Sequence, residues 1–226
     1  MEEGIALIRT ADLFDLSHSL AGMYLDNFAH PWEALEGLGN EILRIGSSLG
    51  AEYRAELPGV WIHHSAQVSP GAWLEGPCII GPETQVRHGA YVRGNVLVGA
   101  NCVVGNSTEL KNAILFDGVQ APHFNYVGDS ILGFRAHLGA GVILSNLKSD
   151  RSTIIVRAGE HSYPTGFRKL GSMIGDGAEI GCNCVLNPGT VVGRASVLYP
   201  GLVLRGMIPE RSIVKASGQI VGREGF

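Results

Sequence analysis

A branched aliphatic residue returns every six positions over most of this 226-residue chain. The register runs from Ile62 to Leu144, with shortened steps after Leu110 and Val127, and again from Ile174 to Leu204. A period of six fits neither an amphipathic helix nor an alternating half-buried strand. The pattern therefore predicts a short strand plus a corner, repeated as an all-β solenoid whose aliphatic side chains form one inner stack.

Small residues mark two further positions of the repeat. Glycine follows many of the aliphatic residues and suits turns that need a positive φ angle, at Gly81, Gly99, Gly105, Gly128, Gly133, Gly139, Gly175, Gly181 and Gly193. A small or β-branched side chain stands four places after nearly every aliphatic. Three cysteines occupy that position, so we predict that Cys78, Cys102 and Cys184 are buried, reduced thiols.

The first 57 residues lack the six-residue repeat. Apolar residues follow a helical spacing from Leu13 to Met23 and again from Trp32 to Leu49, behind a proline at a plausible first helical turn. We predict that residues 1–57 form a short α-helical cap over the open N-terminal end of the solenoid, where uncovered strand edges would lie. The alternative is that these apolar stripes bind a partner.

Residues 58–226 are assigned to the solenoid, and its repeats lapse at about residues 145–172. Such a long excursion is uncommon in a compact fold, so we predict a protruding functional loop there. It carries six basic or titratable side chains, Lys148, Arg151, Arg157, His161, Arg168 and Lys169. These side chains would meet ligand phosphates, or the loop would be solvated and pack on a neighbouring subunit; both interpretations stay open.

Charge and composition point to no macromolecular partner of strong charge. The 17 Lys and Arg residues are outnumbered by 21 Asp and Glu residues, for a net charge of -4, which gives no bulk attraction to nucleic acid or to an anionic membrane. No apolar run approaches the ~20 residues that span a bilayer, and the acidic start of the chain lacks the pattern of a signal peptide. We expect a cytoplasmic protein.

The histidines raise the question of a metal. A zinc-dependent hydratase of the carbonic anhydrase type would need three imidazoles that converge on one ion. His63 and His64 are adjacent and point to opposite sides of a strand, so they cannot both bind it. We therefore predict no metal site, and a zinc assay would test the alternative.

Four stretches of sequence carry a specific resemblance. They are GNSTELKN (105–112), APHFNYVGDSILG (121–133), LGAGVILSN (138–146) and FRKLGSMIGDGAEIGCNCVLNPGTVVG (167–193). Together with the repeats they resemble the hexapeptide-repeat acyltransferases, in particular the acetyltransferase domain of the bifunctional bacterial enzyme that makes UDP-N-acetylglucosamine. The C-terminal β-helix of archaeal-type sugar-1-phosphate nucleotidylyltransferases is similar too. The resemblance covers about residues 62–215 and implies a left-handed parallel β-helix that forms homotrimers.

The resemblance also implies roles for individual residues. His123 matches the catalytic histidine, and an imidazole suits proton removal at neutral pH. The residues that match acceptor-binding positions are Arg93 and Lys111, for the sugar phosphate, and Tyr126, Asn146 and Asn125. Ala140 and Cys182 match positions that meet the coenzyme A arm, and Lys169 of the charged excursion is assigned to coenzyme A as well. Cys182 stands where the family has a serine, which puts the contact to the thioester or its oxyanion in doubt.

The function that follows is an acetyl-CoA-dependent N-acetyltransferase that acts on an amino-sugar phosphate or a sugar nucleotide, without a metal. The alternative is a non-catalytic trimer that binds a sugar nucleotide or acyl-CoA, or that is a scaffold partner of a separate nucleotidylyltransferase. Only about sixty residues precede the repeats, and they contain no Gly-rich nucleotide-binding loop. We therefore do not expect nucleotidyl transfer from this chain.

Overall fold

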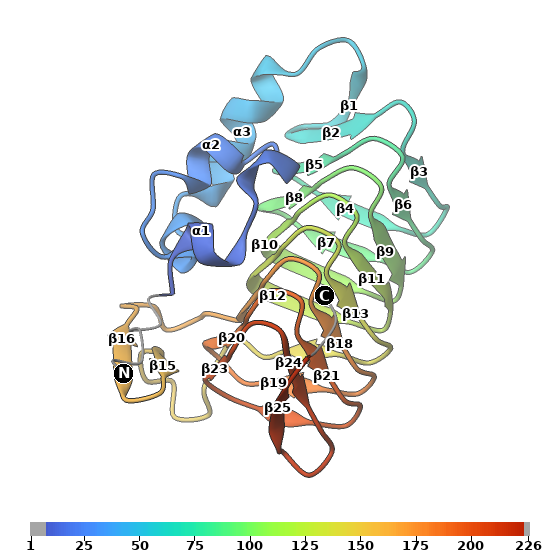
Figure 1. The fold of residues 1–226 in the computed structure, drawn as a ribbon. Helices are drawn as coiled ribbons and strands as arrows, with labels where there is room; N and C mark the ends of the chain where they lie inside the picture. The colour runs from blue at the N-terminus through green and yellow to red at the C-terminus, as the bar shows by residue number, and fades with distance from the viewer. Residues whose placement is uncertain (1–7, 224–226) are drawn as a thin grey trace.

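A computed structural model describes residues 8–223, which wind for the most part as a parallel β-helix with three faces (Figure 1). Face 1 contains β2 (Val60–His63), β5 (Cys78–Ile80), β8 (Val96–Val98), β17 (Ser172–Ile174), β20 (Thr190–Val192) and β23 (Met207–Ile208). Face 2 contains β3 (Gln67–Val68), β6 (Gln85–Val86), β9 (Val103–Asn106), β11 (Gln120–His123), β13 (His137–Leu138), β18 (Glu179–Ile180), β21 (Val197–Leu198) and β24 (Ser212–Val214). The predicted solenoid of hexapeptide repeats is confirmed.

Face 3 contains β4 (Trp73–Glu75), β7 (Tyr91–Arg93), β14 (Ile143–Leu144), β19 (Val185–Leu186) and β22 (Val203–Leu204). Two longer strands, β10 (Glu109–Leu115) and β12 (Tyr126–Leu132), run from face 3 into face 1. They bend at Asn112 and Asp129, whose φ angles are +48°. These bends coincide with the two shortened steps of the repeat, because a continuous strand turns the corner with one residue fewer.

The aliphatic register forms the interior of the β-helix. Val86 pairs with Val104, and Leu110 with Val127, in consecutive coils, and all four side chains are fully buried. Cys78 and Cys102 are buried free thiols, and burial raises the pKa of each to about 12. Cys184 is also free and buried, and burial raises its pKa. The prediction for these three cysteines is confirmed.

The glycines that follow the aliphatic residues have a different role from the predicted one. None of them has a positive φ angle; positive values occur at corner residues such as Asn95, Asn101 and Asn183. A Cβ atom on Gly81 would lie 2.5 Å from the carbonyl carbon of Gly99 in the next coil. Glycine is therefore required because stacked coils leave no room for a side chain, and the explanation by turn geometry was wrong.

The helices lie along a side of the β-helix and do not cover its end (Figure 1). They are α1 (Thr10–Leu13), η1 (Leu16–His18), α2 (Gly22–Leu25), η2 (Pro31–Leu35) and α3 (Leu38–Ser48). The amide of Asp176 donates to the carbonyl of Leu13, and the amide of Asp117 to that of His18. Further along, α3 contacts β5 and β8. At the N-terminal end it is β1 (Tyr53–Leu57) that pairs, antiparallel, with β2.

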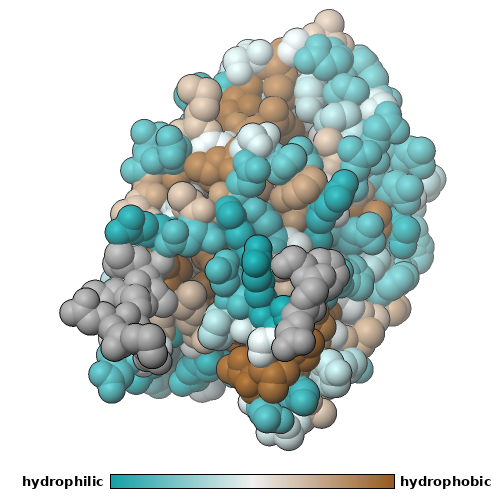
Figure 2. All heavy atoms as spheres, in the orientation of Figure 1, coloured by the Kyte–Doolittle hydropathy of each residue, from teal (hydrophilic) through white to brown (hydrophobic). Residues whose placement is uncertain are grey.

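The outward side chains of face 1 explain this arrangement. They are large, apolar and at most 1% exposed, at Ile79, Leu97, Ile114, Ile131, Met173 and Val191. An apolar stripe along six coils needs a cover as long as itself, which a plug at one end could not provide. Face 2 carries exposed polar residues such as Gln67, Gln85 and Gln120 instead. Figure 2 accordingly has a hydrophilic edge on the right, where β3 and β6 lie. Leu38, Ile42 and Ile45 of α3 are buried against this chain, so this stripe is not free to bind a partner.

The predicted excursion at about 145–172 contains an antiparallel hairpin, β15 (Ile155–Ala158) and β16 (His161–Pro164). Its inner side chains Ile154 and Val156 are fully buried, and β15 contacts β20 and β23. The ring of Tyr163 lies 5.3 Å from that of His30. The excursion thus packs on the same side of the β-helix as the helices do. Finally, β25 (Ile220–Gly222) pairs antiparallel with β24.

Replacing an outward residue of face 1 should release the helical segment. We expect Leu97→Asp to lower the free energy of unfolding by at least about 3 kcal/mol, because it buries an unpaired carboxylate under α3. Urea denaturation measures this loss, and limited proteolysis should cut residues 38–48 faster. Gln85→Asp, an exposed outward position on face 2, is the matched control. Unchanged proteolysis of Leu97→Asp would contradict the packing role of face 1.

Candidate functional site

A polar cluster occupies the outer surface of face 3 on β7, β10 and β12. Arg93 Nη1 lies 2.7 Å from Glu109 Oε1. The strand register places Glu109 beside Tyr91 on one side and beside Tyr126 on the other. The hydrogen bond to Glu109 raises the pKa of the Arg93 guanidinium, so this side chain stays cationic. Burial and, next, the charge of Glu109 raise the pKa of the Tyr126 hydroxyl, which stays protonated and able to donate.

Asp129 holds the inner part of this cluster together. It is 5% exposed, and it accepts hydrogen bonds from Asn112 Nδ2 at 3.0 Å and from Asn146 Nδ2 at 2.5 Å. Lys111 Nζ lies 3.5 Å from the same carboxylate. Asn146 Nδ2 also lies 3.2 Å from Tyr126 Oη. Of the predicted acceptor residues, Arg93, Lys111, Tyr126 and Asn146 are therefore brought together on one surface.

His123 stands at the corner between faces 2 and 3, at the end of β11. Its side chain is exposed, and it lies beside Asn106 of the preceding coil. The next residue, Phe124, has a φ angle of +52° and is 59% exposed. Because the corner turns immediately after His123, the imidazole is presented outward next to the cluster on face 3.

Asn125 differs from the other candidates for acceptor binding. It is 2% exposed, its Nδ2 donates to the carbonyl of Gly139 at 2.8 Å, and its Oδ1 accepts from the amide of His123 at 3.2 Å. Because both polar atoms of this buried side-chain amide form hydrogen bonds with the main chain, neither is free to bind a substrate. The prediction of direct contact does not fit this placement; Asn125 instead fixes the corner that carries His123.

Ala140 and Cys182 follow His123 along the same corner in successive coils. The amide of Gly141 donates to the carbonyl of His123 at 3.0 Å, and the amide of Asn183 to that of Ala140 at 2.8 Å. Cys182 is exposed and free. A Cβ atom on Gly139 would lie 2.6 Å from the nitrogen of Cys182, so the backbone here is close-packed. The two predicted coenzyme residues thus form a continuous edge with His123.

Within one chain, Lys169 lies away from the edge formed by His123, Ala140 and Cys182. It pairs with Leu147 in an isolated bridge at the neck of the excursion. It lines a cavity of about 360 Å³ together with Lys111, Asn112 and Asp129, at the corner between faces 3 and 1. The whole width of face 3 separates it from Ala140 and Cys182. Within one chain the structure therefore groups Lys169 with the acceptor residues, and its assignment to coenzyme A stays a prediction.

Sequence reasoning missed three members of the cluster, Glu109, Asn112 and Asp129. Each falls within a stretch that carries the resemblance, and Asn112 and Asp129 stand in the shortened steps. An asparagine or aspartate tolerates a positive φ angle better than other side chains. A shortened repeat with such a residue was the available signal for a bend.

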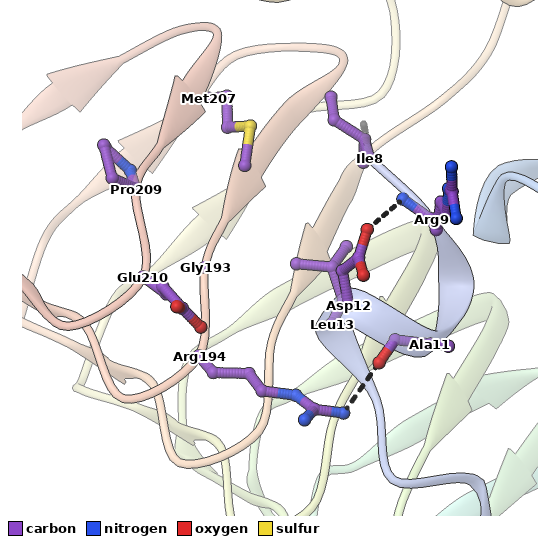
Figure 3. Close-up of a pocket in the computed structure, with 10 residues that line it drawn as sticks. All are labelled: Ile8, Arg9, Ala11, Asp12, Leu13, Gly193, Arg194, Met207, Pro209 and Glu210. Carbon is purple, nitrogen blue, oxygen red and sulfur yellow. Dashed lines mark hydrogen bonds between the residues drawn. The ribbon is translucent and has the colours of Figure 1, made fainter. Parts of the chain in front are cut away.

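Another cavity lies between α1 and the last coils (Figure 3). It measures about 590 Å³, and none of the predicted site residues lines it. In it, Arg194 Nη2 donates to the carbonyl of Ala11 at 3.1 Å. This contact attaches the helical segment to the β-helix, so the cavity is a seam between the two.

Between residues 8 and 223, no three or more His, Cys, Asp or Glu side chains are grouped so that they could hold a metal ion. No helix in that part of the chain is both long and apolar enough to cross a membrane.

The chain is similar in sequence to several known proteins. The chain is 32% identical over 201 residues to the bifunctional protein GlmU of Methanococcus maripaludis, which is 88% of this chain and 49% of that protein. It is 30% identical over 189 residues to a bifunctional sugar-1-phosphate nucleotidylyltransferase/acetyltransferase of Sulfurisphaera tokodaii, 81% of this chain and 46% of that protein. A family model, the GMPPB C-terminal domain, matches residues 74–158. Over most of its length the chain is thus similar to the acetyltransferase part of these hexapeptide-repeat proteins.

This hexapeptide-repeat chain spans about half the length of the relatives it matches. Solved structures of low identity share parts of it. One is the UDP-N-acetylglucosamine O-acyltransferase of Moraxella catarrhalis, with 13% identity, a TM-score of 0.44, and coverage of 70% of this chain and 69% of that one. Another is the acetyltransferase domain of PglB from Neisseria gonorrhoeae, with 21% identity, a TM-score of 0.34, and coverage of 70% and 55%.

Proposed function

We propose that this chain is an acetyl-CoA-dependent N-acetyltransferase whose acceptor is an amino-sugar phosphate or a sugar nucleotide, and that His123 is the general base. The observation that carries the proposal is the exposed imidazole at the junction of two surfaces. The polar cluster of face 3 lies on one side of it, and the edge with Ala140 and Cys182 continues from it on the other. An acceptor and a thioester can thus approach His123 from different directions.

The reaction balances with these groups alone. The acceptor amine attacks the thioester carbonyl, a C–N bond forms, and the C–S bond breaks to release coenzyme A. His123 takes the proton that the amine loses and passes it to the departing thiolate. Arg93 and Lys111 offer cationic donors to a phosphate, and Tyr126 and Asn146 offer neutral hydrogen bonds to the sugar. Holding both substrates in place supplies much of the rate enhancement.

Several features support the proposal. One relative is named as a nucleotidylyltransferase/acetyltransferase, and the motif residues of the resembled domain recur here at His123, Lys111, Tyr126 and Asn146. We propose further that the protein is a cytoplasmic homotrimer with sites between subunits, in which a neighbour completes the coenzyme site. Sedimentation or light scattering tests the trimer.

The direct test is release of free thiol from acetyl-CoA in the presence of glucosamine-1-phosphate and of a panel of amino-sugar nucleotides. Acceptor-dependent release with formation of an acetylated sugar is the expected result. No release with any acceptor, although coenzyme A or a sugar nucleotide binds, would refute the transferase.

That outcome would favour a non-catalytic trimer that binds or scaffolds. The exposed Cys182 favours this non-catalytic alternative. A thiol is a weak hydrogen-bond donor compared with a hydroxyl, and stabilisation of a tetrahedral oxyanion depends on good donors.

Asp129 should act through the groups it holds. We expect Asp129→Asn to raise the KM for the acceptor about tenfold and to leave kcat and the KM for acetyl-CoA nearly unchanged, because a hydrogen bond to a charged group is worth about 1.5–3 kcal/mol. Steady-state kinetics measure the split. Asp150→Asn, an exposed position in the excursion, is the control. A fall in kcat with an unchanged KM would contradict a positioning role.

A further inference from the structure

The cavity beside Lys111 is lined by three separate parts of the chain. Leu35 and Glu36 come from the end of η2, Asn95, Lys111, Asn112 and Asp129 from the corner between faces 3 and 1, and Phe167, Lys169 and Leu170 from the neck of the excursion. The helical wall is closely seated, because a Cβ atom on Gly39 would lie 2.5 Å from Asn95 Oδ1. At about 360 Å³ the cavity is within the usual size range of small-molecule sites.

The cavity lies at the opposite edge of face 3 from His123. Tyr126, on the face itself, is three strand residues from Asp129, a distance of about 10 Å, and His123 stands still further back around the other corner. The two cations Arg93 and Lys111 lie between these edges on neighbouring strands. An acceptor whose amine is at His123 and whose phosphate is at these cations therefore points its remaining part at the cavity.

The lining matches a nucleoside in its chemistry. Leu35 and Leu170 are nearly buried and form an apolar floor. Phe167 adds a partly buried aromatic ring, and every nucleobase can stack on such a ring. The amides of Asn95 and Asn112 can both donate to and accept from base edges. Glu36 is exposed, and a carboxylate can accept from a ribose hydroxyl.

Two of the charged side chains around the cavity are available to a ligand. Within residues 8–223, neither Glu36 nor Lys169 takes part in an ion pair. Lys169 adds a second ammonium beside Lys111 on the cavity wall, and both can donate to phosphate oxygens. A sugar 1-phosphate would end at these lysines and leave the apolar part of the cavity, at Leu35, Phe167 and Leu170, unfilled.

We infer that this cavity is the nucleoside subsite of the acceptor, so that the substrate is a nucleoside diphosphate sugar rather than a sugar 1-phosphate. The inference rests on the proposed acetyl transfer for the orientation of the acceptor. It gives the helical segment and the excursion a common role, since Glu36 and Phe167 read the nucleoside from the two walls. Lys169 contacts the diphosphate.

The test measures binding and does not require catalysis. Isothermal titration of the full-length protein compares uridine diphosphate and guanosine diphosphate with inorganic pyrophosphate. We expect at least one nucleoside diphosphate to bind more than tenfold more tightly than pyrophosphate. Phe167→Leu and Glu36→Gln should each remove most of that difference and leave pyrophosphate binding unchanged, whereas Lys169→Met should weaken both ligands.

Two controls keep the test decisive. Glu160→Gln, an exposed change in the hairpin turn, should alter neither affinity, and unchanged thermal midpoints exclude misfolding of the variants. Equal binding of nucleoside diphosphates and pyrophosphate, no binding of either, or a preference that survives in Phe167→Leu and Glu36→Gln would overturn the inference. Failure of the acetyltransferase would appear separately, as tight nucleotide binding without thiol release.

Discussion

His123→Ala is expected to lower acceptor-dependent release of coenzyme A by several hundredfold. A positioned general base contributes typically about 10²–10⁴-fold to such a step. The exposed imidazole is at the junction of the acceptor cluster and the edge with Ala140 and Cys182, and the attacking amine must lose a proton there. Substrate binding should change little, because the phosphate contacts lie across face 3. The thiol-release assay gives the rate, and titration calorimetry gives the affinity for both substrates.

The matched control is His161→Ala, which removes an exposed imidazole from the hairpin. It should keep the full rate. The oligomeric state and thermal midpoint of both variants should equal those of the parent protein, since both imidazoles are exposed. If His123→Ala retained more than about a third of the activity, another group would have to be the base.

Gly105→Ala is expected to damage both stability and activity. A Cβ atom on Gly105 would overlap the carbonyl group of Pro122 in the next coil, so one of the two coils must shift. Overpacking of this kind costs about 1–3 kcal/mol or more, which for a chain of this length lowers the thermal midpoint by roughly 2–12 °C. Because His123 follows Pro122 directly, the same shift should lower the acetyl-transfer rate at least tenfold at temperatures where the protein is still folded.

Gly222→Ala is the matched control for this change. No atom lies within 4 Å of a Cβ built there, so the added methyl should shift the midpoint by less than about 1 °C. Differential scanning calorimetry compares the two variants. A Gly105→Ala protein as stable as the parent would mean that the coils can separate at this corner, and the close-packing account of these glycines would fail.

The repeat could be predicted from the sequence because it depends on contacts within a coil and between neighbouring coils. Each short strand places one large aliphatic side chain in the interior, so such a residue must return at a fixed period. Stacked coils also require glycine where two backbones touch. The excursion could also be predicted, because the six-residue period lapses there. The residues around His123 were found through resemblance, because a histidine at a corner has no periodic signature of its own.

The role of the glycines shows what a sequence pattern alone cannot decide. Glycine at Gly81 is compatible with a positive φ angle and also with close backbone approach, and only the coordinates distinguish the two. Asn125 is a similar case. Its neighbours in sequence suggested a substrate contact, but the side chain turns inward to the carbonyl of Gly139, fourteen residues later in the next coil. Contacts across coils cannot be read from adjacency along the chain.

By itself, then, the sequence determined the β-helix, its interruption and the set of residues from which a site could be made. The tertiary structure alone decided where the helical segment lies, that Lys169 joins Lys111 and not Cys182, and that Asp129 gathers Lys111, Asn112 and Asn146. The physical reason is that the coils of the β-helix and the segment that covers it are specified by different kinds of contact. Repeats are specified by nearest-neighbour packing along the chain, whereas a segment that covers face 1 settles where apolar area and hydrogen bonds from distant coils add up most favourably.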